Sequence, residues 1–275
     1  MASGDDAPNV AVLGTTGRWD PDQYVRFRDE RAQPFYDLAA LVRRHPGMRV
    51  VDLGCGPGEL TRWLHVELQA GETLGLDRSP EMLAAAAAHA GGGVRFERGD
   101  IVEFAASGGH GPYDLIFSNA ALQWVSGHAT LLPQLRSMLA PGGQLAIQVP
   151  FGGDHPARSV LGEVAAAEPY ASAMQGYRRP GGAQPPDWYA TRLYELGASE
   201  QVVRMNVYGH LLPSARSLVE WFKGSALTPY RERLPEEMYG ALVEAYARRL
   251  VEQFGDDRPY FLPFNRILMW ARWES

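Results

Sequence analysis

The run VVDLGCGPG over residues 50–58 is a short apolar strand that ends in an acidic residue and three alternating glycines. Gly54, Gly56 and Gly58 let the backbone turn sharply and approach a ligand with no Cβ in the way. A dinucleotide-binding loop has the wider spacing G-x-G-x-x-G and places a pyrophosphate on the following helix. The tighter spacing, together with the carboxylate of Asp52, favours a nucleotide ligand that carries positive charge.

Two further acids close the next two strand-like segments. Asp77 lies about twenty residues beyond the glycines, where a carboxylate accepts both ribose hydroxyls of a nucleotide. Asp100 follows residues 94–97 and suits the exocyclic amine of adenine, with Ile101 packing on the ring or offering its backbone N–H. S-adenosyl-L-methionine fits these acids because it has a sulfonium, an α-ammonium and no phosphate. We therefore predict it as the cofactor, with Arg78 beside Asp77 as a further contact.

Residues 77–81 also resemble a helix start, with Ser79 as N-cap and Pro80 in the first turn. Both interpretations of this segment hold together, because Asp77 can bind ribose while Ser79 caps the helix.

A polar and aromatic corner follows the next apolar strand, residues 113–118. Asn119, Gln123 and Trp124 are expected at the same edge of the sheet as the three acids, since ligands of open α/β sheets bind at the carboxyl ends of the strands. We assign these residues to the cofactor as well.

The elements that position these residues alternate between strand and helix, which predicts an α/β fold with a parallel sheet. Beyond the strands already named, we expect helices at 59–69, 82–90 and 131–139, a turn at 141–143 and a strand at 144–149. Farther on, we expect strands at 201–212 and 261–273, helices at 214–222 and 235–254, and a loop around 176–186.

Bulk properties exclude several classes of function. The formal net charge of -6 over 275 residues gives no basic surface for nucleic acid. The single cysteine, Cys55, excludes an internal disulfide, and no Cys/His cluster has the spacing of a metal site. There is no apolar run of membrane-spanning length and no signal-peptide pattern, so we expect a cytoplasmic protein without a membrane partner, either a monomer or a homo-oligomer.

The chain resembles class I S-adenosylmethionine-dependent methyltransferases. The resemblance is carried by residues 52–58, Asp77, Gly99 and Asp100, residues 119–124, and the segment LAPGG at 139–143. It implies a Rossmann-like doubly wound sheet of about seven strands, the last antiparallel, with an N-terminal helical lid and a helical cap. We divide the chain accordingly into an N-terminal segment at 1–17, a lid at 18–45, a cofactor-binding core at 46–150, a cap insertion at 151–198, and the rest of the sheet with additional cap helices at 199–275.

Residues 19–34, 119–124, 208–221 and 264–272 carry a closer resemblance, to the trans-aconitate methyltransferases of this family. This resemblance implies a small acidic methyl acceptor and a methyl ester as product. A carboxylate has a pKa of roughly 4, is ionised at neutral pH and needs no general base, so the enzyme needs positioning and cationic clamps instead. We predict Arg31, Arg179 and Arg266 as clamps and Tyr24 as a hydroxyl donor.

Two alternatives stay open at this point. The acceptor could be a hydroxyl, amine or carbon of a specialised metabolite, with His128 as its base, although His128 could equally be a polar residue at a helix start. The chain could also be a cyclase or a binding protein that uses the cofactor without transferring methyl. The glycine spacing disfavours a dehydrogenase.

Overall fold

The computed structural model describes residues 28–152, 155–177, 182–256 and 258–274. Its centre is a seven-stranded sheet of order β3-β2-β1-β4-β5-β7-β6. The first five strands pair in parallel, and β7 pairs antiparallel with both β5 and β6. The Rossmann-like sheet with an antiparallel last strand is thus confirmed. The strands are β1 (Arg49–Leu53), β2 (Glu72–Asp77), β3 (Val94–Arg98), β4 (Tyr113–Asn119), β5 (Leu139–Pro150), β6 (Glu200–Leu212) and β7 (Tyr260–Arg272).

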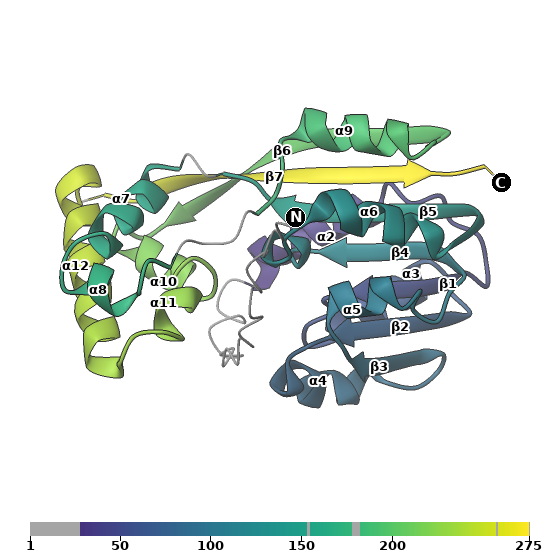
Figure 1. Ribbon diagram of the computed structural model, residues 1–275, viewed down its shortest axis with the longest axis horizontal. Helices are drawn as coiled ribbons and strands as arrows, with labels where there is room; N and C mark the ends of the chain where they lie inside the picture. The colour runs from purple at the N-terminus through teal and green to yellow at the C-terminus, as the bar shows by residue number, and fades with distance from the viewer. Residues whose placement is uncertain (1–27, 153–154, 178–181, 257, 275) are drawn as a thin grey trace, which may run out of the picture.

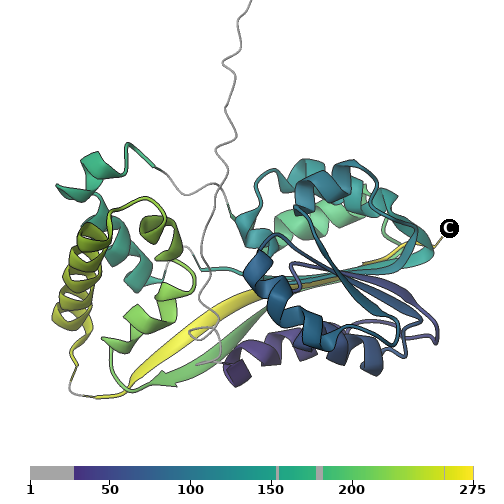
Figure 2. The ribbon, with the colours of Figure 1, turned by 90° about the horizontal axis from the view of Figure 1, so that it is seen from below.

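Helices cover both faces of the sheet (Figures 1 and 2). On one face, α2 (Arg28–Ala39) and α3 (Glu59–Glu67) pack Phe35 and Leu64 against Phe117 and Leu268. The other face is covered by α5 (Ile101–Ala106), α6 (His128–Ser137) and α9 (Pro186–Glu195). A helix α4 (Pro80–Ala86) and the 3-10 turn η1 (Ala87–His89) connect β2 to β3. Burial of both faces explains why the parallel strands read as nearly continuous apolar runs.

The two long strands β6 and β7 extend beyond the sheet and carry a separate helical cap, visible at the left of Figure 1. Its apolar core includes Leu218, Trp221, Leu242 and Tyr246, together with Leu262 of β7. The longest described helix is α12 (Glu236–Phe254), and no described helix is both long and apolar enough to cross a membrane. The cap helices are α7 (Pro156–Ala165), α8 (Tyr170–Ala173), α10 (Ser217–Lys223), α11 (Thr228–Arg231) and α12 (Glu236–Phe254).

Helix α9 packs with the sheet rather than with the cap helices. Its buried residues Tyr189 and Leu193, one turn apart, belong to the same apolar cluster as Ile267 and Met269 of β7. Our sequence-based division counts residues 186–195 in the cap insertion. An apolar stripe shows that a helix is buried on one side, but not which partner buries it.

The carboxyl ends of the parallel strands face the cap. The arrowhead of β4 points toward it in Figure 1, and the first described helix after β5 is cap helix α7. The turn expected at 141–143 lies within β5, as an irregularity: Tyr113 pairs with Leu139, whereas Leu115 pairs with Gln144. Groups at the strand ends therefore meet in the region between sheet and cap.

Candidate functional site

The glycine loop after β1 folds back onto β2. The backbone N–H groups of Gly54 and Cys55 donate to the carbonyl oxygen of Leu76 at 2.7 and 3.0 Å. Gly58 and Gly56 have φ angles of 79° and 55°, a region that favours glycine. A Cβ at Gly58 would lie 2.6 Å from the Phe96 ring, whereas a Cβ at Gly56 would meet nothing within 4 Å. Gly58 thus serves close packing of α3, and Gly56 borders open space on the ligand side.

Asp77 ties this loop to the end of β2. One carboxylate oxygen accepts the N–H of Gly56 at 2.9 Å, and the other accepts the N–H of Ser79 at 2.9 Å. Each oxygen keeps acceptor capacity for a hydroxyl of a bound ligand. Ser79 accepts the N–H of Met82 at 3.2 Å, so its predicted role as N-cap of α4 is confirmed. Arg78 is exposed between the two.

Asp52 lies beneath the loop, only 2% exposed, and accepts a hydrogen bond from the Thr61 hydroxyl at 2.6 Å. Burial raises the pKa of Asp52 to about 7, the Thr61 hydrogen bond opposes this shift, and the charge of Asp77 adds to it. A cation above the loop would favour the ionised form. The neighbouring Cys55 is also buried, and its thiol pKa is raised, first by burial and then by Asp52 and Asp77.

Asp100 begins α5 at the end of β3. Its Oδ1 accepts the N–H groups of Val102 and Glu103 at 2.8 and 3.3 Å, so this oxygen caps the helix. Ile101 follows at the helix start, and its Cδ1 lies 4.0 Å from the position of a Cβ at Gly54. Both residues lie at the expected edge, and their contact with adenine stays a prediction.

The corner after β4 holds buried amide groups. Asn119 ends the strand, and Gln123 and Trp124 belong to the 3-10 turn η2 (Leu122–Trp124). The Nε2 of Gln123 donates to the carbonyl oxygen of Ala120 at 2.6 Å. Among the described residues, no donor meets Asn119 Oδ1 or Gln123 Oε1, although both atoms are buried. Buried acceptors of this kind are expected where a ligand supplies the donor.

A second polar group lies on the neighbouring strands. Arg266 of β7 is 4% exposed, and its Nη1 donates to Gln148 Oε1 of β5 at 3.2 Å. The guanidinium carbon of Arg266 also lies 5.0 Å from the centre of the Phe264 ring. Because Arg266 pairs in register with Pro150, the last residue of β5, its charge lies at the same edge as the strand ends described above.

Tyr208 connects β6 to α2 next to this group. Its hydroxyl donates to Asp37 Oδ2 at 2.6 Å and accepts from Asn206 Nδ2 at 3.3 Å. Burial and the hydrogen bond to Asp37 raise the pKa of Tyr208 to about 12, partly offset by Asn206 and Arg266. Tyr208 therefore remains protonated and fixes α2 over the face that carries Arg266.

His128 is not placed as a base. It is 4% exposed, its Nε2 donates to the carbonyl oxygen of Leu122 at 2.9 Å, and its Nδ1 accepts from the Tyr189 hydroxyl at 2.6 Å. Both ring nitrogens are thus engaged within the protein, and the imidazole braces η2 against α9. The interpretation as a polar residue at a helix start agrees with this geometry, and we leave His128 out of the proposed site.

The predicted lid and cap-loop residues are not tested by the structure. Tyr24 and Arg179 lie outside the described residues. Arg31 belongs to α2, but its side chain lies outside the described part. Their roles stay predictions.

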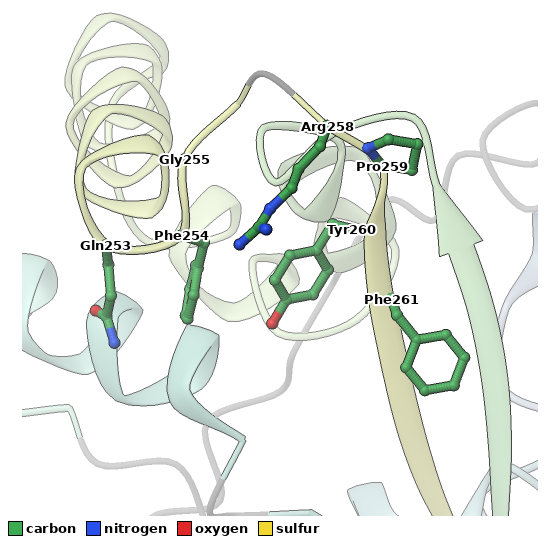
Figure 3. Close-up of a pocket in the computed structure, with 7 residues that line it drawn as sticks. All are labelled: Gln253, Phe254, Gly255, Arg258, Pro259, Tyr260 and Phe261. Carbon is green, nitrogen blue, oxygen red and sulfur yellow. The ribbon is translucent and has the colours of Figure 1, made fainter.

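A cavity of about 440 Å³ lies at the far end of the cap, between the end of α12 and the start of β7 (Figure 3). Phe254, Arg258 and Tyr260 line it, and none of the predicted site residues does. Because it lies away from the strand ends, it is not the candidate site.

Gln148 is the residue that our sequence reasoning missed. A glutamine inside the apolar run AIQV of a buried parallel strand is unusual, because an unpaired buried amide is unfavourable. A polar residue within an apolar strand sequence was therefore the signal that could have identified Gln148.

The chain matches the family model described as "Methyltransferase domain" over residues 50–143. It is 42% identical over 259 residues to the trans-aconitate 2-methyltransferase of Deinococcus radiodurans, covering 92% of this chain and 97% of the relative. It is 36% identical over 261 residues to the trans-aconitate 2-methyltransferase of Mycobacterium tuberculosis, covering 92% of this chain and 96% of the relative.

Among solved structures, the chain is similar to Haemonchus contortus phosphoethanolamine N-methyltransferase 2 in complex with S-adenosyl-L-methionine. The TM-score is 0.54 at 18% sequence identity, over 88% of this chain and 52% of the other. This likeness concerns the fold alone.

Proposed function

Because the chain belongs to the trans-aconitate 2-methyltransferase family, and is therefore an S-adenosylmethionine-dependent methyltransferase, we propose that it methylates a carboxylate of trans-aconitate or a closely similar polycarboxylate. When bound, S-adenosylmethionine supplies the methyl group: a bond forms from a carboxylate oxygen to the methyl carbon as the carbon–sulfur bond breaks, and its electron pair goes to sulfur.

The residues at the ends of β1 to β4 fit this cofactor. Open space at Gly56 leaves room for the ligand, and Asp77 is held with both oxygens at the rim of that space. The unmatched acceptor Asn119 Oδ1 suits an ammonium or hydroxyl donor of the ligand. The buried carboxyl of Asp52 adds negative potential beneath the loop.

The methyl acceptor needs no general base. A carboxylate with a pKa of roughly 4 reaches the site already ionised. The chain's task is to hold it in line with the methyl group and to exclude water. We assign the holding of an acceptor carboxylate to Arg266, whose guanidinium can donate two parallel hydrogen bonds.

The observation that carries the proposal is the buried Arg266, which lies at the same carboxyl edge of the sheet as the residues that fit the cofactor. A buried guanidinium is expected to face an anion or a set of hydrogen-bond acceptors. An anionic methyl acceptor suits a site that holds this guanidinium.

An assay of S-adenosylhomocysteine release tests the proposal. We would compare trans-aconitate, cis-aconitate, citrate, isocitrate and neutral phenols at saturating cofactor between pH 7 and 9. We expect turnover of trans-aconitate, at a rate that is flat with pH because no base must be deprotonated. Turnover of a phenol or amine alone, rising with pH, would refute the carboxylate acceptor. Cofactor binding without release from any acceptor would favour a non-methylating protein.

A further inference from the structure

The side chain of Gln148 is completely buried near the end of β5, at 0% exposure. Its Nε2 meets no hydrogen-bond acceptor among the described residues. A buried amide N–H without a partner destabilises a folded protein, and a bound ligand that supplies the acceptor removes this cost.

The orientation of this amide is fixed by its other end. Oε1 accepts from Arg266 Nη1 at 3.2 Å. A flipped amide would set its NH₂ group against the guanidinium N–H, two donors in contact. The unmatched atom of Gln148 is therefore a donor.

An unmatched acceptor lies beside this donor. Asn119 of β4 pairs in register with Gln148, and its buried Oδ1 meets no donor among the described residues. Both side chains lie on the face covered by α2, because Phe117 and Ala146, two residues earlier on each strand, pack with that helix's cluster. Arg266 lies on the same face, two residues before Leu268. The end of β4 thus presents a hydrogen-bond acceptor, Asn119 Oδ1, whereas the ends of β5 and β7 present hydrogen-bond donors.

A second glutamine on the same strand shows what a structural role looks like. Gln144 lies four residues earlier, on the same face, and is 2% exposed. Its Oε1 accepts from the N–H of Arg43 at 2.8 Å and from Trp270 Nε1 at 2.9 Å, and its Nε2 donates to the carbonyl oxygen of Arg43 at 2.8 Å. A glutamine buried only for structure in β5 is therefore paired at both ends, and Gln148 differs from it.

We infer that Gln148 Nε2 donates a hydrogen bond to an acceptor carboxylate beside Arg266, and that the line between Asn119 and Gln148 separates the cofactor from the acceptor. This inference rests on the proposed function. The cationic cofactor meets the hydrogen-bond acceptor Asn119 Oδ1. The anionic methyl acceptor meets the hydrogen-bond donors of Gln148 and Arg266. Gln148 is thus a specificity-determining residue for carboxylates.

The test measures binding of trans-aconitate to the protein loaded with S-adenosylhomocysteine, by titration calorimetry, so that it does not depend on turnover. Gln148→Met removes the donor without adding charge, and we expect about tenfold weaker trans-aconitate binding, the effect of one lost hydrogen bond to a charged group. Gln148→Glu keeps an acceptor for Arg266 and places a negative oxygen where the donor was, so its binding should be weaker still. Affinity for S-adenosylhomocysteine should not change in either variant.

Gln144→Met is the matched control. It removes the paired amide from the same face of the same strand, so the melting temperature should fall while trans-aconitate affinity stays the same. Gln148→Met also removes the acceptor of Arg266 Nη1, so its melting temperature should fall too, but only this variant of the two should lose trans-aconitate affinity. Gln148→Glu keeps an acceptor for Arg266 and gives a second variant if Gln148→Met does not fold.

The outcomes separate this inference from the proposed function. Wild-type turnover of trans-aconitate with unchanged binding in both Gln148 variants would overturn the inference alone. Loss of S-adenosylhomocysteine affinity instead of trans-aconitate affinity would also overturn it, because the donor would then serve the cofactor. Binding of trans-aconitate that needs Gln148 but leads to no methyl transfer would support the inference and overturn the function. No binding of trans-aconitate, cis-aconitate, citrate or isocitrate to the wild type would overturn both.

Discussion

The strand ends of β1 to β4 and those of β5 to β7 differ in the kind of polar atom they present. The first group offers acceptors: the carboxylates of Asp52 and Asp77, and the amide oxygen of Asn119. The second group offers the donors Gln148 Nε2 and Arg266. One sheet edge is therefore divided between a half suited to a cationic ligand and a half suited to an anionic one.

The two halves also differ in how they are assembled. The acceptor atoms of the first half come from successive strand–helix units between residues 52 and 119. The second half brings together Asp37 of α2, Gln148 of β5, Tyr208 of β6 and Arg266 of β7. A fold of this kind can keep a local cofactor motif while the acceptor half varies through distant residues.

The largest expected effect lies in the cofactor half. Asp77→Ala removes the acceptor proposed for two ribose hydroxyls and releases the N–H groups of Gly56 and Ser79. Two lost hydrogen bonds to a charged group weaken S-adenosylhomocysteine binding by about 100-fold or more. Calorimetric titration checks this. The control is Asp114→Ala at the opposite end of the sheet, where Asp114 accepts the N–H of Arg49 at 2.7 Å: it should lower stability and leave cofactor affinity unchanged.

The corresponding substitution on the methyl-acceptor side, at the ends of β5 to β7, is at Arg266. Arg266→Gln removes the charge but keeps a polar group beside Gln148 and Phe264. We expect the KM for trans-aconitate to rise by about 30-fold, from the loss of one charged hydrogen bond, with cofactor affinity unchanged. Steady-state kinetics and a parallel titration measure both. If Arg266→Gln weakens the cofactor and Asp77→Ala weakens the acceptor, the division into two halves is wrong.

A smaller effect separates two glycines of the same loop. Gly56→Ala introduces a methyl group into the open space on the ligand side, so we expect about tenfold weaker cofactor binding. Because Gly56 has a φ of 55°, the alanine also strains the backbone and lowers stability modestly, but it meets no clash. Gly58→Ala places the same methyl group 2.6 Å from the Phe96 ring and should destabilise the fold itself. Melting temperature and cofactor titration on both variants distinguish these effects. Equal losses of stability would contradict the assignment of Gly56 to the ligand side.

The sequence alone predicted that the polar residues after β1 to β4 lie at one edge of the sheet, because these residues follow a local rule, and their contacts with the cofactor stay a prediction. Each polar residue ends an apolar strand, and parallel strands end at one edge, so Asp52, Asp77 and Asn119 could be brought together without knowledge of distant contacts. The alternation of strands and helices follows the same local pattern and was confirmed, whereas the antiparallel last strand, also confirmed, was implied by the resemblance to the family.

The residues that the sequence did not bring together make contacts between segments that are distant in the chain. Gln148 and Arg266 are 118 residues apart, and the bond between them depends on the antiparallel register of β5 and β7. The sequence left His128 open between a base and a polar residue at a helix start, because its partner Tyr189 is 61 residues away in the chain. Only the fold brings such pairs into contact.

The last prediction concerns the proton on Asp52. Burial raises its pKa to about 7, so around pH 6.5 most of the empty protein carries a protonated carboxyl at this position. A bound sulfonium and ammonium favour the ionised form, so binding of S-adenosylmethionine should release a proton there. If only the ionised form binds, affinity at pH 6.5 is about fourfold weaker than at pH 8. Titrations in buffers of different ionisation enthalpy measure the released proton.

Asp52→Asn is the control, and it should bind S-adenosylmethionine more weakly at pH 8 and without proton release at pH 6.5.

The same carboxyl also determines how the stability of the folded protein changes with pH. Because its pKa is higher in the folded protein than in the unfolded chain, its stabilising contribution is complete below about pH 4 and is lost as pH rises through about 7. The melting temperature of the cofactor-free wild type should therefore fall more than that of Asp52→Asn between pH 5 and about 8, and the cofactor should reduce this difference. A proton release that persists in Asp52→Asn would assign the linkage to another group, and the cofactor half would then lack the buried negative charge that distinguishes it from the half of Arg266.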